Sequence, residues 1–318
     1  MLDPTRPDDD QTAEFYSESG MIPTAAFTVM PAVCFALAAL GGIFYSYLMS
    51  WISLAYAHPV IAIVAAFALG RFVAWAVARW HVRSVPYSLL FAAATSMVAY
   101  YSAWAADILA RFGVEAVDGN PFLAWSPLVL GAYIVDFYQQ GYWSIDGSEI
   151  SGPRLLLHWQ VEAALFFGFP LYEIWKNRKS RSFCEGCKRW TEVQLGVMRF
   201  YPGSEAELTE RLARRDFAAL AERAGIPESE DVFLRMNVHI CGGCRITRLL
   251  TIERVVAQTQ ANGTQKIEVK SVVDRMEVDD DTLQRIYAFG GPDGEPVQGP
   301  LAVPKPAAPQ VGPPPGFG

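Results

Sequence analysis

Charged residues are scarce in the first half of this 318-residue chain. They make up 19% of the whole sequence, below the roughly 25% of a typical soluble domain. Residues 1–175 hold 6 basic and 14 acidic side chains, whereas residues 176–318 hold 20 and 19. No Asp, Glu, Lys or Arg occurs from Ser19 to Gly70 or from Ser84 to Ala106. This deficit excludes a disordered chain and predicts a membrane part followed by a soluble part.

Catalytic motifs are also missing. The sequence contains no glycine-rich phosphate loop followed by Lys-Ser/Thr, no G-x-S-x-G and no H-E-x-x-H, and its charged half has no paired-carboxylate constellation typical of acid–base catalysis. Five cysteines are too few for a disulfide-dense secreted domain, and a net charge of −7 excludes a nucleic-acid packaging protein. We therefore expect no catalytic residues and predict that the chain is not an enzyme.

The uncharged runs predict transmembrane helices. A bilayer core of ~30 Å needs about 20 helical residues, so the 52 residues from Ser19 to Gly70 fit two spans with a turn near His58-Pro59. The next uncharged run fits a third span. A fourth apolar stretch contains Glu162 and Glu173. The four predicted spans lie near 23–48, 59–80, 84–106 and 155–175.

The remaining segments of the first half and the two ends are predicted as follows. Residues 1–20 form a polar N-terminal tail, and residues 21–181 form the transmembrane domain. Residues 108–152 form an outer-side segment with a helix or re-entrant piece near 127–141 and a hairpin that turns at Asp146-Gly147. Residues 291–318, with 9 Pro and 6 Gly, form a disordered tail.

Basic residues near the span ends predict the orientation. Arg79 and Arg83 lie between the second and third spans, and Lys176 and Arg178 follow the fourth. Both groups are expected in the cytoplasm, which places the N- and C-termini inside. Arginine outnumbers lysine by 20 to 6, a bias that often accompanies GC-rich bacterial genomes. We expect an integral protein of a bacterial plasma (inner) membrane.

Three of the ionisable residues inside the predicted spans form a candidate polar cluster. Arg71 lies midway along the second, and Glu162 lies in the fourth with His158 one helical turn before it. Such groups are costly in a bilayer and mark functional or packing sites. Spans two and four run in the same direction, so we predict an Arg71–Glu162 pair, joined by His158, inside the bundle. It either fixes helix packing or lines a path for a proton, ion or small molecule.

The charged half has the pattern of a small α+β domain over residues 182–290. Ser204 is a predicted N-cap, and Gly225 is the predicted stop for a helix over 204–224. Asn262-Gly263 is a hairpin signal, and a short helix is expected near Asp281. Strands are predicted at 190–201, 232–240, 249–258 and 266–273.

The strongest chemical signal is a pair of C-x-x-C motifs. Cys184 and Cys187 form the first, and Cys241 and Cys244 form the second. A two-residue gap lets both thiolates of a tight turn point at one ion, and two such turns make a Cys₄ site, the usual arrangement for structural zinc. A closed shell of this kind stabilises a fold and leaves no position for a catalytic water. Iron with the same ligands, or redox-active thiols, are the alternatives.

These motifs resemble the zinc-ribbon module, in which two knuckles at hairpin ends share one metal. The resemblance covers residues 183–275. It implies that the helix at 204–224 is an insertion between the two ribbon halves, because 53 residues separate Cys187 from Cys241. Cys34 is interpreted as a packing residue of the first span, and His239 as an ordinary strand residue.

Three hypotheses of function follow. In the first, four helices anchor a cytoplasmic zinc-ribbon-like domain that contacts other proteins. Nucleic acid is an unfavoured partner, because residues 183–290 carry 15 basic and 17 acidic side chains. In the second, the chain is a small transporter, channel or channel subunit that uses Arg71, His158 and Glu162. In the third, iron or reactive thiols at the Cys₄ site make it a membrane redox protein.

Overall fold

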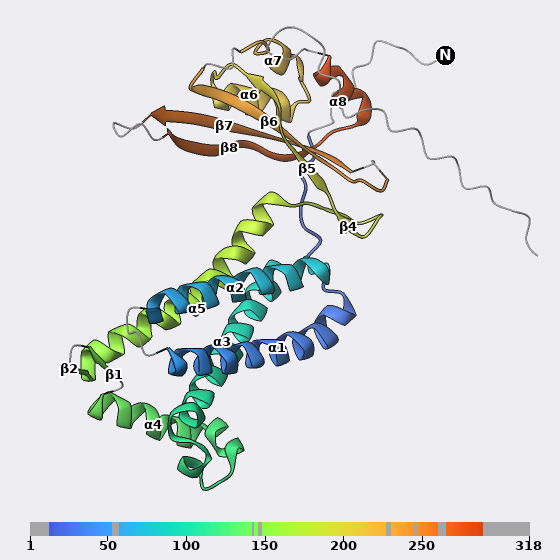
Figure 1. Cartoon of the computed structure of the whole chain (residues 1–318). Helices are drawn as coiled ribbons and strands as arrows, with labels where there is room; N and C mark the ends of the chain where they lie inside the picture. Colours follow the sequence, from blue (N-terminus) through green and yellow to red (C-terminus); the bar gives the residue numbers. More distant parts are fainter. Residues whose placement is uncertain are drawn as a thin grey trace, which may run out of the picture. The chain divides into compact units, whose positions relative to one another are not determined.

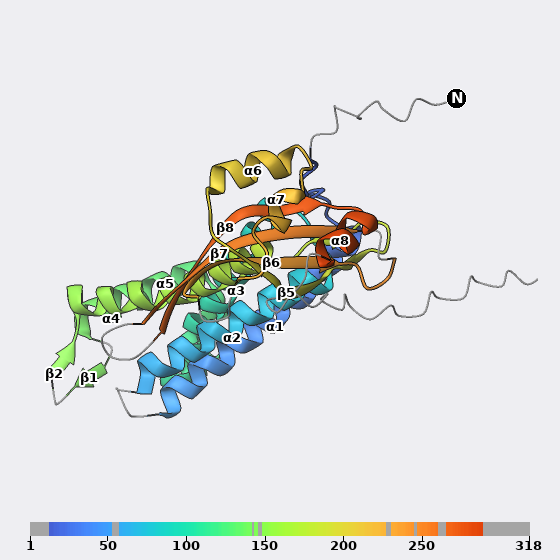
Figure 2. The same ribbon diagram turned by 90° about the horizontal axis from the view of Figure 1, so that it is seen from above.

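A computed structural model describes residues 13–52, 57–141, 143–145, 148–226, 230–244, 247–259 and 265–288. The chain forms two compact units (Figures 1 and 2). One is helical and runs from Glu18 to Trp190; the other combines the N-terminal segment up to Ser17 with the chain from Thr191 onward. The predicted order of an apolar helical part followed by a small sheet-containing domain is confirmed. The predicted turn residues Asp146-Gly147 and Asn262-Gly263 and the tail over 291–318 lie outside the described residues.

The helical unit contains four long helices: α1 (Thr24–Trp51), α2 (Ala57–Arg79), α3 (Val85–Phe112) and α5 (Gly152–Ser180). Each covers one predicted span. Among the described residues, α1, α2 and α3 are the helices long and apolar enough to cross a membrane, which indicates a membrane protein. Helix α5 is 29 residues long. It differs from these three helices in composition, because it contains Arg154, Glu162 and Glu173.

Close backbone approach joins the long helices in pairs. A Cβ added at Gly42 of α1 would lie 2.1 Å from the Ala99 carbonyl oxygen of α3. A Cβ at Gly70 of α2 would lie 3.1 Å from the Phe169 carbonyl group of α5. Small residues allow such contacts, and helices pack through them where lipid removes the hydrophobic driving force. The bundle therefore depends on glycine at these two crossings.

The segment between α3 and α5 has the predicted hairpin and a helix. It contains two 3₁₀ turns, Val114–Val117 and Pro121–Trp125, then α4 (Pro127–Gln140) and the antiparallel strands β1 (Trp143–Ile145) and β2 (Ser148–Ile150). The Tyr101 hydroxyl donates to the Trp125 carbonyl at 2.6 Å, which ties the segment to α3. With 14 residues, α4 is too short to cross a bilayer.

The second unit is built on a four-stranded antiparallel sheet in the order β5-β6-β7-β8. The predicted strands are confirmed as β5 (Glu192–Phe200), β6 (Val232–Ile240), β7 (Arg248–Thr259) and β8 (Gln265–Glu277). Figure 1 shows α6, α7 and α8 on one side of this sheet. Leu234, Met236 and Val238 of β6 alternate toward the helices and join Leu208, Leu212 and Leu220 in one buried core.

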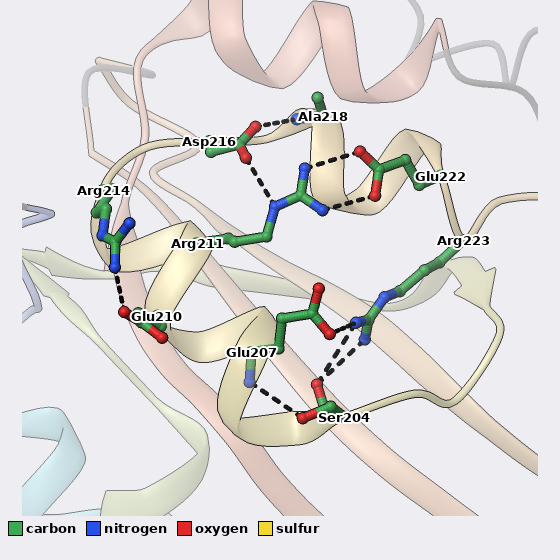
Figure 3. Close-up of polar contacts among 9 residues, drawn as sticks. All are labelled: Ser204, Glu207, Glu210, Arg211, Arg214, Asp216, Ala218, Glu222 and Arg223. Atoms are coloured by element: carbon green, nitrogen blue, oxygen red, sulfur yellow. Dashed lines mark hydrogen bonds and ion pairs between the residues drawn. The ribbon is translucent and has the colours of Figure 1, made fainter.

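The predicted single helix over 204–224 is wrong. The structure has α6 (Glu205–Ala213) and α7 (Ala218–Ala221) with a break between them. Arg215 has φ of +59°, in the left-handed region that ends a helix. Arg211 spans the break: its Nε lies 2.7 Å from Asp216 and its Nη1 2.6 Å from Glu222 (Figure 3). The apolar pattern is the same for one helix or two, so it did not reveal the break.

Residues 13–17 of the N-terminal segment, predicted as a polar tail, pack against the second unit. Phe15 forms an antiparallel bridge with Met276, and the Tyr16 amide donates to the Arg275 carbonyl at 2.9 Å. The Ala13 amide donates to the Ala213 carbonyl after α6, also at 2.9 Å. Residues 13–17 thus extend the sheet edge along the C-terminal end of β8, which a polar composition does not predict.

Helix α8 (Asp280–Tyr287) supplies a pH-dependent test of the second unit. Asp279 is its N-cap, and the Thr282 amide donates to the Asp279 carboxylate at 2.6 Å. This bond lowers the pKa of Asp279 below its usual value. The carboxylate therefore stabilises the fold above its unfolded-state pKa, and this stabilisation is lost as the pH falls through the folded-state pKa.

We expect Asp279→Ala to destabilise the second unit by about 0.5–2 kcal/mol at pH 7. Asp281→Ala is the matched control, because Asp281 lies in the first turn and does not cap. Thermal unfolding of the two variants at pH 7 and pH 3 measures the effect. The difference between them should shrink at pH 3; a difference that stays constant with pH would refute the capping role.

Candidate metal centre

The first C-x-x-C motif lies on a small hairpin. Strands β3 (Phe183–Cys184) and β4 (Arg189–Trp190) pair antiparallel, with Cys184 opposite Arg189. The turn between them carries Cys187 and ends at Lys188, whose φ is +50°. Cys184 is 2% exposed, and Cys187 is half-buried. The tight turn brings both thiols to the same end of the hairpin, as the two-residue spacing predicts.

Contacts with the C-terminal end of α2 and with the α2–α3 connection hold this hairpin within the helical unit. The Arg83 guanidinium lies 4.5 Å from the centroid of the Phe183 ring and forms an ion pair with Glu185. The Trp190 indole donates to the Ala78 carbonyl at 2.9 Å. Burial raises the pKa of Glu185, but hydrogen bonds from Ser19 and Arg83 outweigh it and lower that pKa overall. None of these contacts was predicted, because the sequence does not show which loop faces the hairpin.

The second motif follows β6. The Cys241 amide donates to the Thr247 carbonyl at 3.1 Å, which closes the loop between β6 and β7. A Cβ at Gly242 would lie 2.7 Å from a carboxylate oxygen of Glu192 on β5. A larger residue would therefore have to displace that carboxylate. Cys241 is fully buried, and Cys244 is half-buried.

The four thiols converge. The sulfur atoms of Cys184, Cys187, Cys241 and Cys244 all lie within 4.8 Å of one another. A tetrahedral zinc ion with Zn–S bonds of about 2.3 Å places its sulfurs about 3.8 Å apart. Four soft, largely buried donors thus fit a metal that prefers thiolate, and the predicted ligand set can hold one ion. The arrangement is loosely consistent with a zinc-ribbon-like module.

The surrounding fold differs from the implied ribbon. The resemblance makes the helix between the two motifs an insertion, whereas α6 and α7 contribute Leu208, Leu212 and Leu220 to the main core of the sheet. The two knuckles belong to hairpins of unequal size. The first pairs two residues on each strand, and the second connects strands of 9 and 12 residues.

The other cysteine and the nearby histidine do not join the cluster. Cys34 is 1% exposed and packs in the helical core with Met30 and Phe91. His239 lies on β6 with its Nε2 3.4 Å from the Thr251 hydroxyl of β7. Burial lowers the pKa of His239, which favours the neutral imidazole. His239 is thus a buried strand residue.

Arg71 has a different partner from the predicted one. Its guanidinium lies 3.3 Å from Glu173, not Glu162. The prediction aligned α2 and α5 at their N-terminal ends. However, α5 is longer than the predicted span, and Arg71 and Glu173 are 8 and 7 residues before the ends of their helices at Arg79 and Ser180. Counted from the observed C-terminal ends of α2 and α5, the two residues lie at nearly the same level.

His158 and Glu162 do lie together, around a small cavity. The Tyr45 hydroxyl of α1 donates to the Glu162 carboxylate at 2.5 Å. His158 and Glu162 line the same cavity as Asp107 of α3. Tyr45 and Asp107 were not singled out in the sequence, because a tyrosine inside an apolar run and an acid at its end carry no distinct pattern.

Similarity to known proteins does not refine these assignments. No protein-family model, curated protein or solved structure matches the chain.

Proposed function

We propose that this chain is a non-enzymatic integral membrane protein in which a structural zinc ion stabilises a domain that contacts other proteins. The convergence of four thiols within 4.8 Å is the observation that carries the proposal. An all-thiolate shell favours zinc or iron over hard cations. With four protein ligands, the ion has no open position for substrate, so its role is to stabilise the fold.

The proposed topology has four spans in a bacterial plasma membrane, with α5 as the fourth. Its length is sufficient for a span, and the buried Glu173 has an arginine partner in α2. Arg79 and Arg83 would lie in the cytoplasm with the basic end of α5. The metal-binding domain would then be cytoplasmic, where reducing conditions keep cysteines available as ligands.

An exposed apolar surface supports the role in protein contact. On the sheet face away from α6 and α8, Phe233 lies opposite Val255, and Val255 lies opposite Val269. Ile267 and Val269 of β8 are 60% and 45% exposed. Adjacent exposed apolar side chains on a sheet edge are typical of sites where a partner binds. We call this pair, Ile267 and Val269, the β8 patch.

Photo-crosslinking in native membranes tests the proposed contact. We expect a photoreactive amino acid at position 267 to give a discrete protein adduct. The same group at position 268 is the control, since adjacent strand residues point to opposite faces. Adducts at 267 that disappear with Val269→Asp would support a specific contact. Absence of adducts at 267, or equal labelling at both positions, would contradict the proposal.

A small transporter, channel or channel subunit is the second candidate function. One observation favours it: His158 and Glu162 share a polar cavity within the helical unit. Ionisable groups in such a location are costly and commonly mark an ion or proton site. Arg71 does not line this cavity, so the candidate now depends on His158 and Glu162.

A further inference from the structure

The cavity around Glu162 has the size of a site for an ion or a few waters. Its volume is about 40 Å³, whereas pockets for organic ligands span roughly 300–1,000 Å³. A single water needs about 10–15 Å³ on such a measure. Its polar lining comes from three helices: Tyr45 and Ser46 of α1, Tyr100 and Asp107 of α3, and His158 and Glu162 of α5.

The charges around the cavity do not balance. Asp107 forms an ion pair with Arg111, one helical turn further along α3, at 3.0 Å. Glu162 receives a hydrogen bond from the Tyr45 hydroxyl, and the described residues that line the cavity include no lysine or arginine. If both carboxylates are ionised and the His158 imidazole is neutral, Asp107, Arg111 and Glu162 together carry one net negative charge. An uncompensated charge inside a helical bundle is strongly unfavourable, so the site favours one added positive charge.

Ser46 independently indicates a ligand. Its side chain lines the same cavity, and the residue is only 3% exposed. Its Oγ is buried and has no hydrogen-bond partner among the described residues. A buried hydroxyl without a partner costs about 1–3 kcal/mol, and such groups in native structures commonly mark an ion or water. A hydroxyl oxygen is a hard ligand, as is the Glu162 carboxylate, and both suit a hard cation.

We propose that this cavity binds one small monovalent cation, with Glu162 and Ser46 supplying oxygen ligands. One net negative charge matches a single positive charge. A divalent ion would instead leave one excess positive charge inside the bundle, which is also unfavourable. The inference deepens the transport candidate but does not depend on transport, because binding is an equilibrium property. It is also independent of the Cys₄ centre, which lies on other residues.

Cation-dependent stability of the full chain in mild detergent tests the inference. Thermal unfolding is measured at pH 7.5 in NaCl, KCl or N-methylglucamine chloride at constant ionic strength. A ligand that binds only the folded state stabilises it by RT ln(1 + [L]/Kd), so we expect a saturable rise in Tm with Na⁺ or K⁺ and none with N-methylglucamine. Glu162→Gln should abolish the rise, and Ser46→Ala should weaken cation binding at least several-fold.

Two matched variants control for loss of packing. Ser50→Ala removes an exposed hydroxyl from α1, where Ser50 donates to the Tyr47 carbonyl of its own helix. Asp136→Asn neutralises an exposed carboxylate on α4. Both should keep the wild-type cation response. If Glu162→Gln does not fold, the comparison of the cation-dependent Tm of Ser46→Ala with that of Ser50→Ala tests the inference. Equal Tm values in all three salts would overturn the inference, as would a stability that responds to pH alone, because a proton would then be the only compensating charge.

Discussion

Replacing Cys184 and Cys241 with serine is expected to remove the bound metal and unfold the region around the cysteine cluster. These two ligands are the most buried of the four, and each C-x-x-C motif loses one. Structural zinc sites have apparent binding free energies of about 10–16 kcal/mol in zinc-finger peptides, comparable to or larger than the whole stability of a typical domain. Loss of the metal should therefore lower the free energy of unfolding by more than a single change in core packing does.

Limited proteolysis and metal analysis of the purified chain measure this effect. The double variant should be cleaved rapidly between residues 182 and 288, while the helices α1 to α3 remain protected. Cys34→Ala is the matched control, because Cys34 is also a buried thiol but lies in α1, away from the cluster. It should retain full metal content. A double variant with wild-type protease resistance would show that the cluster does not stabilise the fold.

Gly42→Ala is expected to destabilise the helical unit severely. The new methyl group would lie 2.1 Å from the Ala99 carbonyl oxygen and 3.1 Å from the Ala103 amide nitrogen. Both are backbone atoms of α3, so no side-chain rotation can relieve the clash, and α1 must move away. Overpacking of a well-packed interior typically costs about 1–3 kcal/mol and occasionally more. We expect a cost at the upper end of this range or above it.

The neighbouring Gly41→Ala is the control for that prediction. A Cβ at Gly41 meets no atom within 4 Å, and alanine favours a helix over glycine by about 1 kcal/mol. Gly41→Ala should therefore match or exceed the wild type in thermal stability, whereas Gly42→Ala should lower Tm and yield aggregated protein on size-exclusion chromatography. Similar behaviour of the two variants would mean that α1 and α3 do not cross at Gly42.

Much of the fold followed from local sequence signals. Runs without charge located the three apolar helices, since a bilayer tolerates few ionised groups. The Asn262-Gly263 hairpin signal supported the last two strands of the sheet. The metal ligands were predicted because a C-x-x-C turn fixes its two thiols locally, and two such turns imply one shared ion.

Features that depend on distant packing were not predicted. The partner of Arg71 required the relative alignment of α2 and α5, which helix lengths alone did not provide. At the break between α6 and α7, Arg211 contacts both Asp216 and Glu222, and the apolar pattern does not encode these contacts. The pairing of Phe15 with Met276 joins residues more than 250 positions apart, and no local sequence pattern predicts it. The polar cavity likewise needs three helices to form.

The most direct test of the central claim is the metal content of the full chain purified in mild detergent without added metal. The proposed structural centre predicts one zinc ion per chain by elemental analysis, retained through gel filtration and absent from the Cys184→Ser, Cys241→Ser variant. One iron per chain, or no metal with thiols that oxidise reversibly, would contradict that account. Either result would favour the membrane redox protein, because the same four sulfurs would then carry electrons instead of holding a fold.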